Sequence, residues 1–215
     1  MTRDCKLNIQ LIISDLNDYG FIVLENFLTE NVIKNLNALA KDHYAKQKMQ
    51  AAKIGLESLQ LNNNVRGDST FWLDEHSQNQ DIQAYFKQMN LLKHAINEHL
   101  FLNVHEIEAH LAIYPVGSFY QKHLDQFNRG LGRQARQISS VLYLNANWHA
   151  ENGGELRLYL NEYKCNPDKF SPSKYIDILP NQGRMVLFLS HQFWHEVLPA
   201  KGERLSLAGW FRSRI

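Results

Sequence analysis

Helical spacing of apolar side chains dominates the first hundred residues of the chain. It predicts a short helix over residues 7–17, a strand over 20–25, a helix with Thr29 as its N-cap, and an amphipathic helix from Asp81 to Leu100. The segment over about residues 47–79 is polar, and we expect a long, mobile connection there. The first half of the chain is therefore expected to be mainly helical.

Beyond Asn103 the apolar positions alternate with a two-residue period. This alternation predicts short strands, separated by turns rich in Gly, Pro and Asn, over residues 107–114, 119–123, 137–144, 155–160, 175–179, 184–189, 194–198 and 204–212. Helices followed by a run of short strands are typical of an α+β fold, here a double-sheet jelly-roll barrel buttressed by N-terminal helices. We expect a single domain over residues 1–215, with helical support over 1–103 and the barrel core over 104–215.

Composition and charge exclude several classes of protein. The 215 residues are 44% hydrophobic, which is enough to fill a core and too much for a disordered chain. The net charge is +1, so we expect no nucleic-acid partner. Cys5 and Cys165 are too few for a disulfide framework, and no apolar run is long enough to cross a membrane. We therefore expect a cytoplasmic protein with no membrane contact.

Three residues have the character of a metal site. His123 and Asp125 are two apart on an extended stretch, so their side chains point to one face. Alone, this pair is more often a histidine hydrogen-bonded to a carboxylate. With His195, however, two imidazoles and one carboxylate can occupy one face of an octahedron around Fe(II), which leaves three positions open for oxygen activation. His191 and His195 have zinc-protease spacing, but Gln192 stands where that motif needs Glu.

Arg204 is a further candidate because it begins the last expected strand. If its side chain points inward, a positive charge lies beside an apolar wall and needs an anionic partner. The planar guanidinium suits a carboxylate. A dicarboxylate that chelates iron at one end would present a carboxylate at the other. The alternative is an arginine on the outer face of the barrel.

Several short motifs follow one another in a fixed order, namely Ala112-Ile-Tyr-Pro-Val-Gly117, His123-Leu-Asp125, Ser139-Ser-Val-Leu-Tyr-Leu-Asn145, Gly153-Gly-Glu-Leu-Arg157, and His195-Glu-Val-Leu-Pro199 with Arg204. Together they resemble the prolyl hydroxylases of the hypoxia-inducible-factor type, over about residues 60–212. That family comprises Fe(II)- and 2-oxoglutarate-dependent oxygenases built on a double-stranded, cupin-like β-helix. The resemblance favours a compact, bacterial-like member.

The resemblance implies a role for each residue of the expected cavity. Iron would be bound by His123, Asp125 and His195. Arg204 would hold the far carboxylate of 2-oxoglutarate, and the Tyr143 hydroxyl would share that carboxylate. Without the resemblance, Tyr143 would be interpreted as a core aromatic residue.

The resemblance also assigns residues around this centre. Tyr114 corresponds to another tyrosine of the co-substrate pocket, and Trp210 to a tryptophan at the rim of the site. Arg66, Asp68 and Trp72 resemble the segment that enters the mobile loop over the peptide substrate. Taken alone, Arg66 and Asp68 would form an ordinary solvated ion pair in a turn.

The function implied by the resemblance is hydroxylation of a prolyl residue in another protein. It would require Fe(II), 2-oxoglutarate and O2, with ascorbate to maintain the ferrous state. Within the same chemistry, a small molecule or another side chain stays open as the substrate. A non-catalytic β-helix binding module is the alternative of another class, because a fold does not by itself fix a function. Asp125 disfavours a halogenase, and Trp210 with the near-neutral charge disfavours a nucleic-acid demethylase.

Overall fold

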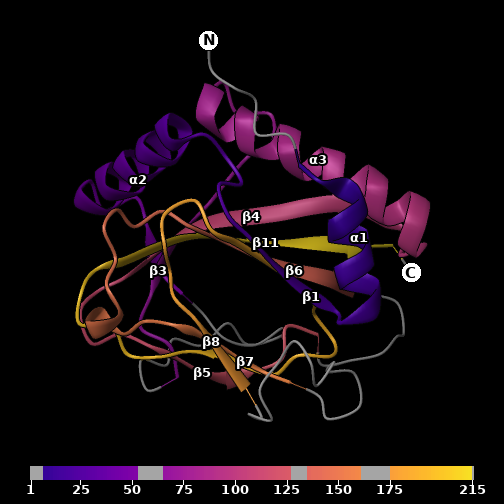
Figure 1. Cartoon of the computed structure of the whole chain (residues 1–215). Coiled ribbons are helices and arrows are strands. Elements are labelled where there is room, and N and C mark those ends of the chain that lie inside the picture. The colour runs from indigo at the N-terminus through magenta and orange to yellow at the C-terminus, as the bar shows by residue number, and fades with distance from the viewer. Residues whose placement is uncertain (1–6, 53–64, 127–134, 161–174, 215) are drawn as a thin grey trace.

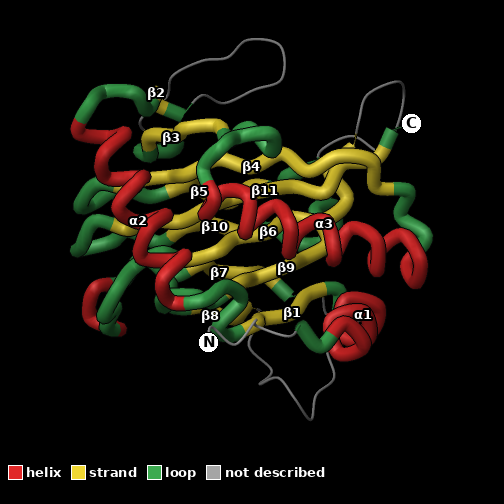
Figure 2. The backbone as a smooth tube through the Cα atoms, turned by 90° about the horizontal axis from the view of Figure 1, so that it is seen from above, coloured by secondary structure: helices red, strands yellow, loops and turns green. Residues whose placement is uncertain are grey.

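The computed structural model describes residues 7–52, 65–126, 135–160 and 175–214. Helices α1 (Ile9–Asp18), α2 (Glu30–Ala45) and α3 (Gln80–Leu100) lie on one side of a large sheet (Figures 1 and 2). Thr29 is the N-cap of α2, as expected, although its side chain makes no cap hydrogen bond. The cap of α3 is stronger, because the Asn79 side chain accepts from two amides of the first turn. The three predicted helices are present in the structure.

The strands form two antiparallel sheets that face each other (Figure 1). The large sheet has the order β1-β9-β6-β11-β4-β3-β2 and the small sheet the order β5-β10-β7-β8. The bounds are β1 Phe21–Leu24, β2 Gln50–Ala51, β3 Ser69–Trp72, β4 Val104–Tyr114, β5 Tyr120–His123, β6 Ala135–Tyr143, β7 Leu156–Tyr159, β8 Tyr175–Ile178, β9 Met185–Leu189, β10 His195–Val197 and β11 Arg204–Ser213, with a short 3₁₀ helix at Ala150–Asn152. Strands β4 to β11 confirm the expected jelly roll, with ends that differ from the predicted ones by a few residues.

The prediction of a long, mobile connection over residues 47–79 was wrong for the described part of this segment. Its described parts include β2 and β3, which extend the large sheet beyond β4. Phe71 of β3 stacks on His43 of α2 with ring centroids 4.2 Å apart, so this segment is packed rather than loose. The prediction was wrong because four residues are too few for a two-residue period to stand out. The part of the expected connection over 53–64 lies outside the described residues.

The two-residue period decides which side chains face the space between the sheets. On β11, Leu205, Leu207 and Phe211 pack into the core beneath the helices. Arg204 and Trp210, on the opposite face of the same strand, contact residues on the small-sheet side of the molecule. The large sheet therefore separates an apolar core from a more polar interior.

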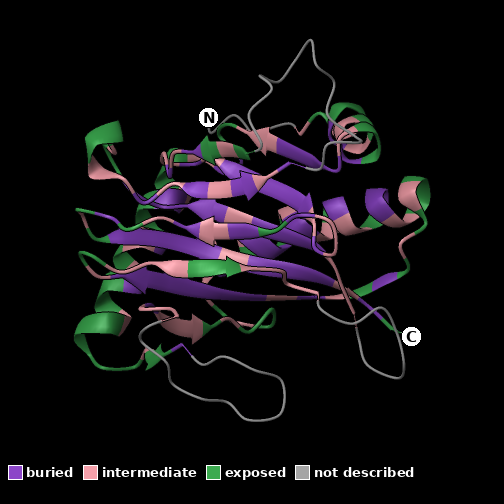
Figure 3. Cartoon of the chain, turned by 90° about the horizontal axis from the view of Figure 1, so that it is seen from below, coloured by how far each residue is buried: buried purple, intermediate pink, exposed green. Residues whose placement is uncertain are grey.

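Burial follows the strands, whereas exposed residues lie mainly in loops and on the outer faces of helices (Figure 3). The buried polar residues include Asp68, Ser139, Ser190, His195 and Arg204. Because a buried polar group must find a partner, their gathering between the sheets indicates a functional site. Among the described helices, none is both long and apolar enough to span a membrane. The two cysteines lie outside the described residues.

Candidate active site

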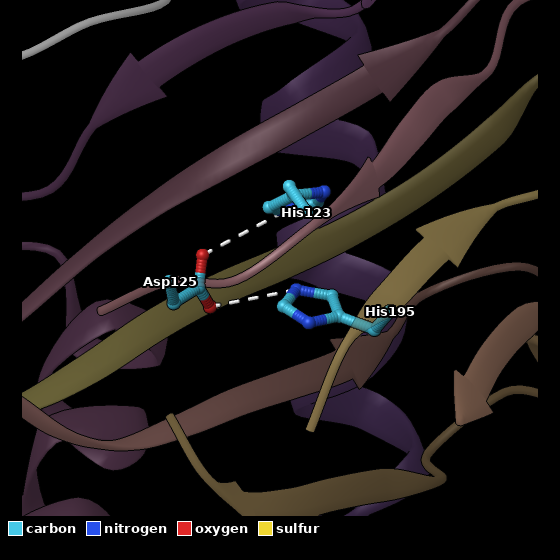
Figure 4. A group of neighbouring side chains, drawn as sticks. All are labelled: His123, Asp125 and His195. Carbon is cyan, nitrogen blue, oxygen red and sulfur yellow. Dashed lines mark ion pairs between the residues drawn. The ribbon is translucent and has the colours of Figure 1, made fainter. Parts of the chain in front are cut away.

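The two sheets bring together the three predicted metal ligands. His123 ends β5 and His195 begins β10, and these strands pair so that the two histidines are direct neighbours across the ladder. Asp125 follows β5, with Oδ1 3.7 Å from Nε2 of His123 and Oδ2 3.6 Å from Nε2 of His195 (Figure 4). One potential ligand atom from each residue lies within 4.8 Å of the others. The spacing is close enough for one ion to contact all three.

A main-chain carbonyl fixes the orientation of each imidazole. Nδ1 of His123 lies 2.7 Å from the Gln121 carbonyl, and Nδ1 of His195 lies 3.0 Å from the Phe193 carbonyl. A carbonyl oxygen only accepts, so each Nδ1 carries a hydrogen, and the neutral form of such a ring has its lone pair on Nε2. The lone pairs point to the side where Asp125 lies. This tautomer is the one that metal-binding histidines adopt when their other nitrogen donates to a carbonyl.

The protonation states of the group suit cation binding. Burial, reinforced by the neighbouring His195, lowers the pKa of His123 to about 3, which keeps the ring neutral. Burial alone would raise the pKa of Asp125. The charges of His195, His123 and Arg136 and the Ser139 hydrogen bond outweigh it, so that this pKa lies well below its usual range. At neutral pH the site thus offers an ionised carboxylate and a neutral His123 ring.

Arg204 is buried in the same interior. Only 1% of the residue is exposed, and its guanidinium carbon lies 5.0 Å and 5.1 Å from the ring centroids of Tyr114 and Tyr143. Nε donates to the Gly154 carbonyl at 2.8 Å and Nη1 to the Ser206 hydroxyl at 3.3 Å. No carboxylate of the described residues forms an ion pair with it. A buried cation without a counter-charge creates a site for an anion.

Tyr143 adds an unused polar group to this pocket. Its hydroxyl is buried and, apart from the neighbouring Arg204 guanidinium, has no hydrogen-bond partner among the described residues. Burial raises the pKa of Tyr143 to about 12, with the charge of Arg204 opposing the rise, so the hydroxyl keeps its hydrogen. A buried hydroxyl beside an unpaired guanidinium is what a carboxylate ligand would require. The structure therefore brings Arg204, Tyr143 and Tyr114 together, the arrangement that the family resemblance implies.

The glycine pair at 153–154 explains how Arg204 is held. Gly154 has φ +73°, and a Cβ there would lie 2.9 Å from the Ala200 Cβ and 3.3 Å from Cδ of Arg204. Only glycine combines this backbone conformation with so close an approach. The Gly154 carbonyl can then accept from Arg204. This contact gives the Gly-Gly motif a physical function.

The segment expected to contact the substrate is anchored by a buried ion pair. Nε and Nη2 of Arg66 donate to the two carboxylate oxygens of Asp68 at 2.7 Å and 2.6 Å, and the Asp68 side chain is 0% exposed. The Arg66 guanidinium also lies 4.3 Å from the ring centroid of Tyr120 on β5. The pair is therefore buried and structural rather than solvated, and it holds β3 next to the site.

Aromatic rings continue from β3 towards the metal group. Trp72 is 53% exposed, and its ring centroid lies 4.8 Å from that of His110 and 6.1 Å from that of Trp210. Trp210 in turn donates its Nε1 hydrogen to Asp125 at 2.7 Å. The predicted rim tryptophan is thus in contact with a candidate ligand, while Trp72 presents a face to solvent.

The sequence carried little signal for the remaining residues of the site. His110 is buried, its Nδ1 has no partner among the described residues, and burial lowers its pKa to about 3. Arg136 stacks on Trp210 at 3.6 Å and pairs with Glu108. The two-residue period places Ser139 on the inner face with Tyr143, but it could not show which partner Ser139 meets.

Comparison with known proteins identifies the family. Residues 109–212 match the profile of the 2OG-Fe(II) oxygenase superfamily. A crystal structure of a prolyl-4-hydroxylase from Pseudomonas putida superposes with a TM-score of 0.81 at 35% identity, over 96% of this chain and 100% of that one. The chain belongs to the 2OG-Fe(II) oxygenase superfamily. The resemblance found in the motifs and the double-stranded β-helix fold are both confirmed.

Other members of the superfamily are similar over nearly the whole chain. A Trichoplax adhaerens prolyl hydroxylase, solved in complex with a hypoxia-inducible-factor oxygen degradation domain peptide, has a TM-score of 0.80 and 26% identity over 94% of this chain and 88% of that one. The hypoxia-inducible factor prolyl hydroxylase of Caenorhabditis elegans is 27% identical over 94% of this chain, which spans 28% of that relative's length. Members of this superfamily use Fe(II), 2-oxoglutarate and O2.

Proposed function

We propose that this 2OG-Fe(II) oxygenase hydroxylates a prolyl residue in a protein substrate. The observation that carries the proposal is the meeting in one interior of the His123–Asp125–His195 group with Arg204, a buried cation that has no carboxylate partner among the described residues. Burying an unpaired guanidinium is costly, so a scaffold that binds no ligand has no physical reason to keep one.

The donor set fits a ferrous ion. The ion would be bound by Nε2 of His123, Nε2 of His195 and one carboxylate oxygen of Asp125, because these three atoms lie close together. The Nδ1 atoms of both histidines are already hydrogen-bonded to main-chain carbonyls. The bound iron supplies activation of O2, coupled to oxidative decarboxylation of 2-oxoglutarate to succinate and carbon dioxide. Ascorbate would keep the iron ferrous.

The remaining residues of the pocket would bind and orient the co-substrate. Arg204 would pair with the far carboxylate of 2-oxoglutarate, and the Tyr143 hydroxyl would donate to the same carboxylate. Tyr114, on the other side of Arg204, would form a wall of the pocket and help exclude water. All three side chains are buried, and none of them is paired with a carboxylate of the described residues.

The substrate class is inferred from the relatives. The Pseudomonas putida structure is of a prolyl-4-hydroxylase, and the Trichoplax adhaerens enzyme was solved with a peptide. Trp72 is an exposed aromatic residue next to the site and would contact the peptide. Asp68 would act indirectly, because its carboxylate is committed to Arg66. A cytoplasmic location stays a prediction from the cysteine content.

Anaerobic titration with Fe(II) and 2-oxoglutarate tests the enzyme against the non-catalytic module. We expect the weak visible charge-transfer band of the iron–2-oxoglutarate chelate in the wild type. His123→Ala and Asp125→Ala should abolish the band. A wild type without a band, or variants that keep it, would favour the binding module.

Mass spectrometry then identifies the substrate class. Cell extract incubated with enzyme, Fe(II), ascorbate and 2-oxoglutarate should contain a protein whose proline gains one oxygen atom. His123→Ala serves as the matched inactive control. Turnover of 2-oxoglutarate with oxygen transferred only to a small molecule, or to another side chain, would contradict prolyl hydroxylation while retaining the oxygenase.

A further inference from the structure

The two oxygens of Asp125 have different surroundings. Oδ2 accepts the Ser139 hydroxyl at 2.6 Å and the Trp210 Nε1 hydrogen at 2.7 Å. Oδ1 accepts no hydrogen bond from a described residue, and the side-chain nitrogens near it are Nε2 of His123 at 3.7 Å and Nη1 of Arg136 at 4.0 Å. The carboxylate is therefore anchored through one oxygen and free at the other.

The two donors are neighbours on the large sheet. Ser139 of β6 is the direct cross-strand partner of Trp210 of β11, and both side chains lie on the inner face. Asp125 belongs to the other side of the interior, just after β5 of the small sheet. The two hydrogen bonds therefore join the sheets at the metal group, and the β6–β11 register fixes where they converge.

A second buried hydroxyl, that of Ser190, sets the direction in which the hydrogen bonds of this group run. The Ser190 hydroxyl lies 2.8 Å from that of Ser139, and Ser190 is 0% exposed. Ser139 has a single hydroxyl hydrogen, which goes to the ionised Asp125 because a carboxylate can only accept. Ser190 must then donate to Ser139. The chain Ser190 to Ser139 to Asp125 runs one way, and each bond polarises the next.

We propose that Ser139 and Trp210 are positioning residues that select Oδ1 of Asp125 as the metal ligand. A carboxylate oxygen has about two lone-pair positions, and on Oδ2 both are filled by donors. A metal ion therefore meets an available lone pair on Oδ1 and is bound through one oxygen only. This inference rests on the proposed metal site and adds which atom binds and what orients it.

The test is metal affinity without turnover. Co(II) is titrated calorimetrically into the full-length, metal-free protein and into Trp210→Phe and Ser139→Ala, each of which removes one donor. We expect each variant to bind Co(II) about 10- to 100-fold more weakly than the wild type, the range typical of lost outer contacts to a ligand. Ser139→Thr, which keeps the hydroxyl, should bind within a few-fold of the wild type.

Two controls separate this effect from general damage. Ser140→Ala removes the adjacent buried hydroxyl, which donates to the Gly209 carbonyl on the other face. Trp148→Phe removes an indole hydrogen bond of 2.9 Å to the Gly153 carbonyl. Neither should change Co(II) affinity. Affinity in Trp210→Phe and Ser139→Ala equal to that of these controls would overturn the inference, as would a Ser139→Thr variant as weak as Ser139→Ala.

The direction of the chain has its own test. Ser190→Ala should weaken Co(II) binding less than Ser139→Ala does, and it should add nothing in the Ser139→Ala background. Independent, additive losses would contradict the relay. A wild type that binds no metal ion removes the proposed function itself, whereas a wild type that binds while all variants bind equally removes only this inference.

Discussion

Arg204 carries a positive charge in the interior without a protein carboxylate to balance it. We expect Arg204→Met to leave the thermal stability of the co-substrate-free protein unchanged or to raise it, because an apolar side chain avoids the cost of desolvating the charge. The same variant should lose the rise in melting temperature that 2-oxoglutarate gives the metal-bound wild type. Differential scanning fluorimetry measures both effects.

Arg157 is the matched control for this change. It is a partly exposed arginine of β7, paired with Asp177. Arg157→Met should lose at most about 1 kcal/mol of stability, as exposed ion pairs do, and keep the response to 2-oxoglutarate. A strongly destabilised Arg204→Met protein would show that the charge is balanced in a way the described residues do not reveal.

Buried neutral histidines make the fold sensitive to acid. Burial lowers the pKa of His110 to about 3, with Asp68, Arg66, Arg136 and Asp125 as the charges around it. In the unfolded chain the pKa is about 6.5, so below that pH the unfolded state binds a proton that the folded state refuses. Stability is therefore present above pH 6.5 and falls as the pH drops towards 3. We expect His110 to account for a loss of about 2 kcal/mol at pH 5 relative to pH 7.5.

Urea unfolding of His110→Met at several pH values checks this expectation. The variant should lose less stability between pH 7.5 and pH 5 than the wild type. Part of the pH dependence of its stability should remain, because the pKa of His123 is also lowered to about 3. His76→Met, at an exposed site, is the control. An identical slope in wild type and His110→Met would mean that His110 becomes protonated in the folded protein.

At the scale of elements, α3 approaches β11 through a glycine. A Cβ on Gly209 would lie 2.8 Å from the Tyr85 hydroxyl and 3.0 Å from Oγ of Ser140. We expect Gly209→Ala to cost about 1–3 kcal/mol, because the added methyl pushes the helix from the sheet. Tyr85→Phe removes the closest atom and should restore part of the loss. Chemical denaturation of both single variants and the double variant measures the coupling, and simple additivity would contradict this explanation.

The buried pair Arg66–Asp68 anchors β3 as an element. Asp68→Asn leaves Arg66 with a neutral partner, and we expect a loss of about 2–4 kcal/mol because a mostly buried charge becomes unpaired. Peptide-coupled turnover should fall while uncoupled decarboxylation of 2-oxoglutarate persists, since the hydrogen bonds of the described residues join Arg66 to Asp68 and neither of them to Arg204. Asp177→Asn is the exposed control. Equal loss of both activities would place Asp68 in the co-substrate pocket.

The strands and the metal group were predictable, whereas the anchoring of the site was not. Alternation from Ile107 to Leu111 of β4 is clear, and His-x-Asp on extended backbone puts both side chains on one face. The four residues of β3 carry no such pattern. The partners of Asp125 lie on strands distant in the sequence, so their contacts depend on the register between sheets. The spacing of residues along one strand cannot encode that register.

For the molecule as a whole, the metal group lies where the small sheet meets the large one, and Asp125 accepts hydrogen bonds from Ser139 and Trp210 of the large sheet. The large sheet shares its core with the helices, whereas the described apolar residues of the small sheet pack mainly against the inner face of the large one. We expect amides of β5 and β10 to exchange faster than those of β4, β6 and β11 in the metal-free protein. Binding of Co(II) with 2-oxoglutarate should slow exchange in β5 and β10 selectively. Hydrogen exchange read by mass spectrometry tests this, and uniform slowing would contradict it. The single-domain interpretation of residues 1–215 stays a prediction.

The two imidazoles take their orientation from peptide carbonyls at positions 121 and 193 rather than from side chains. Every amino acid has a carbonyl, so replacing Gln121 or Phe193 leaves the acceptor in place. Sequence drift around the histidines can therefore alter the rim of the cavity without flipping either ring. New substrate preferences can evolve there while the chemistry at the centre is inherited intact.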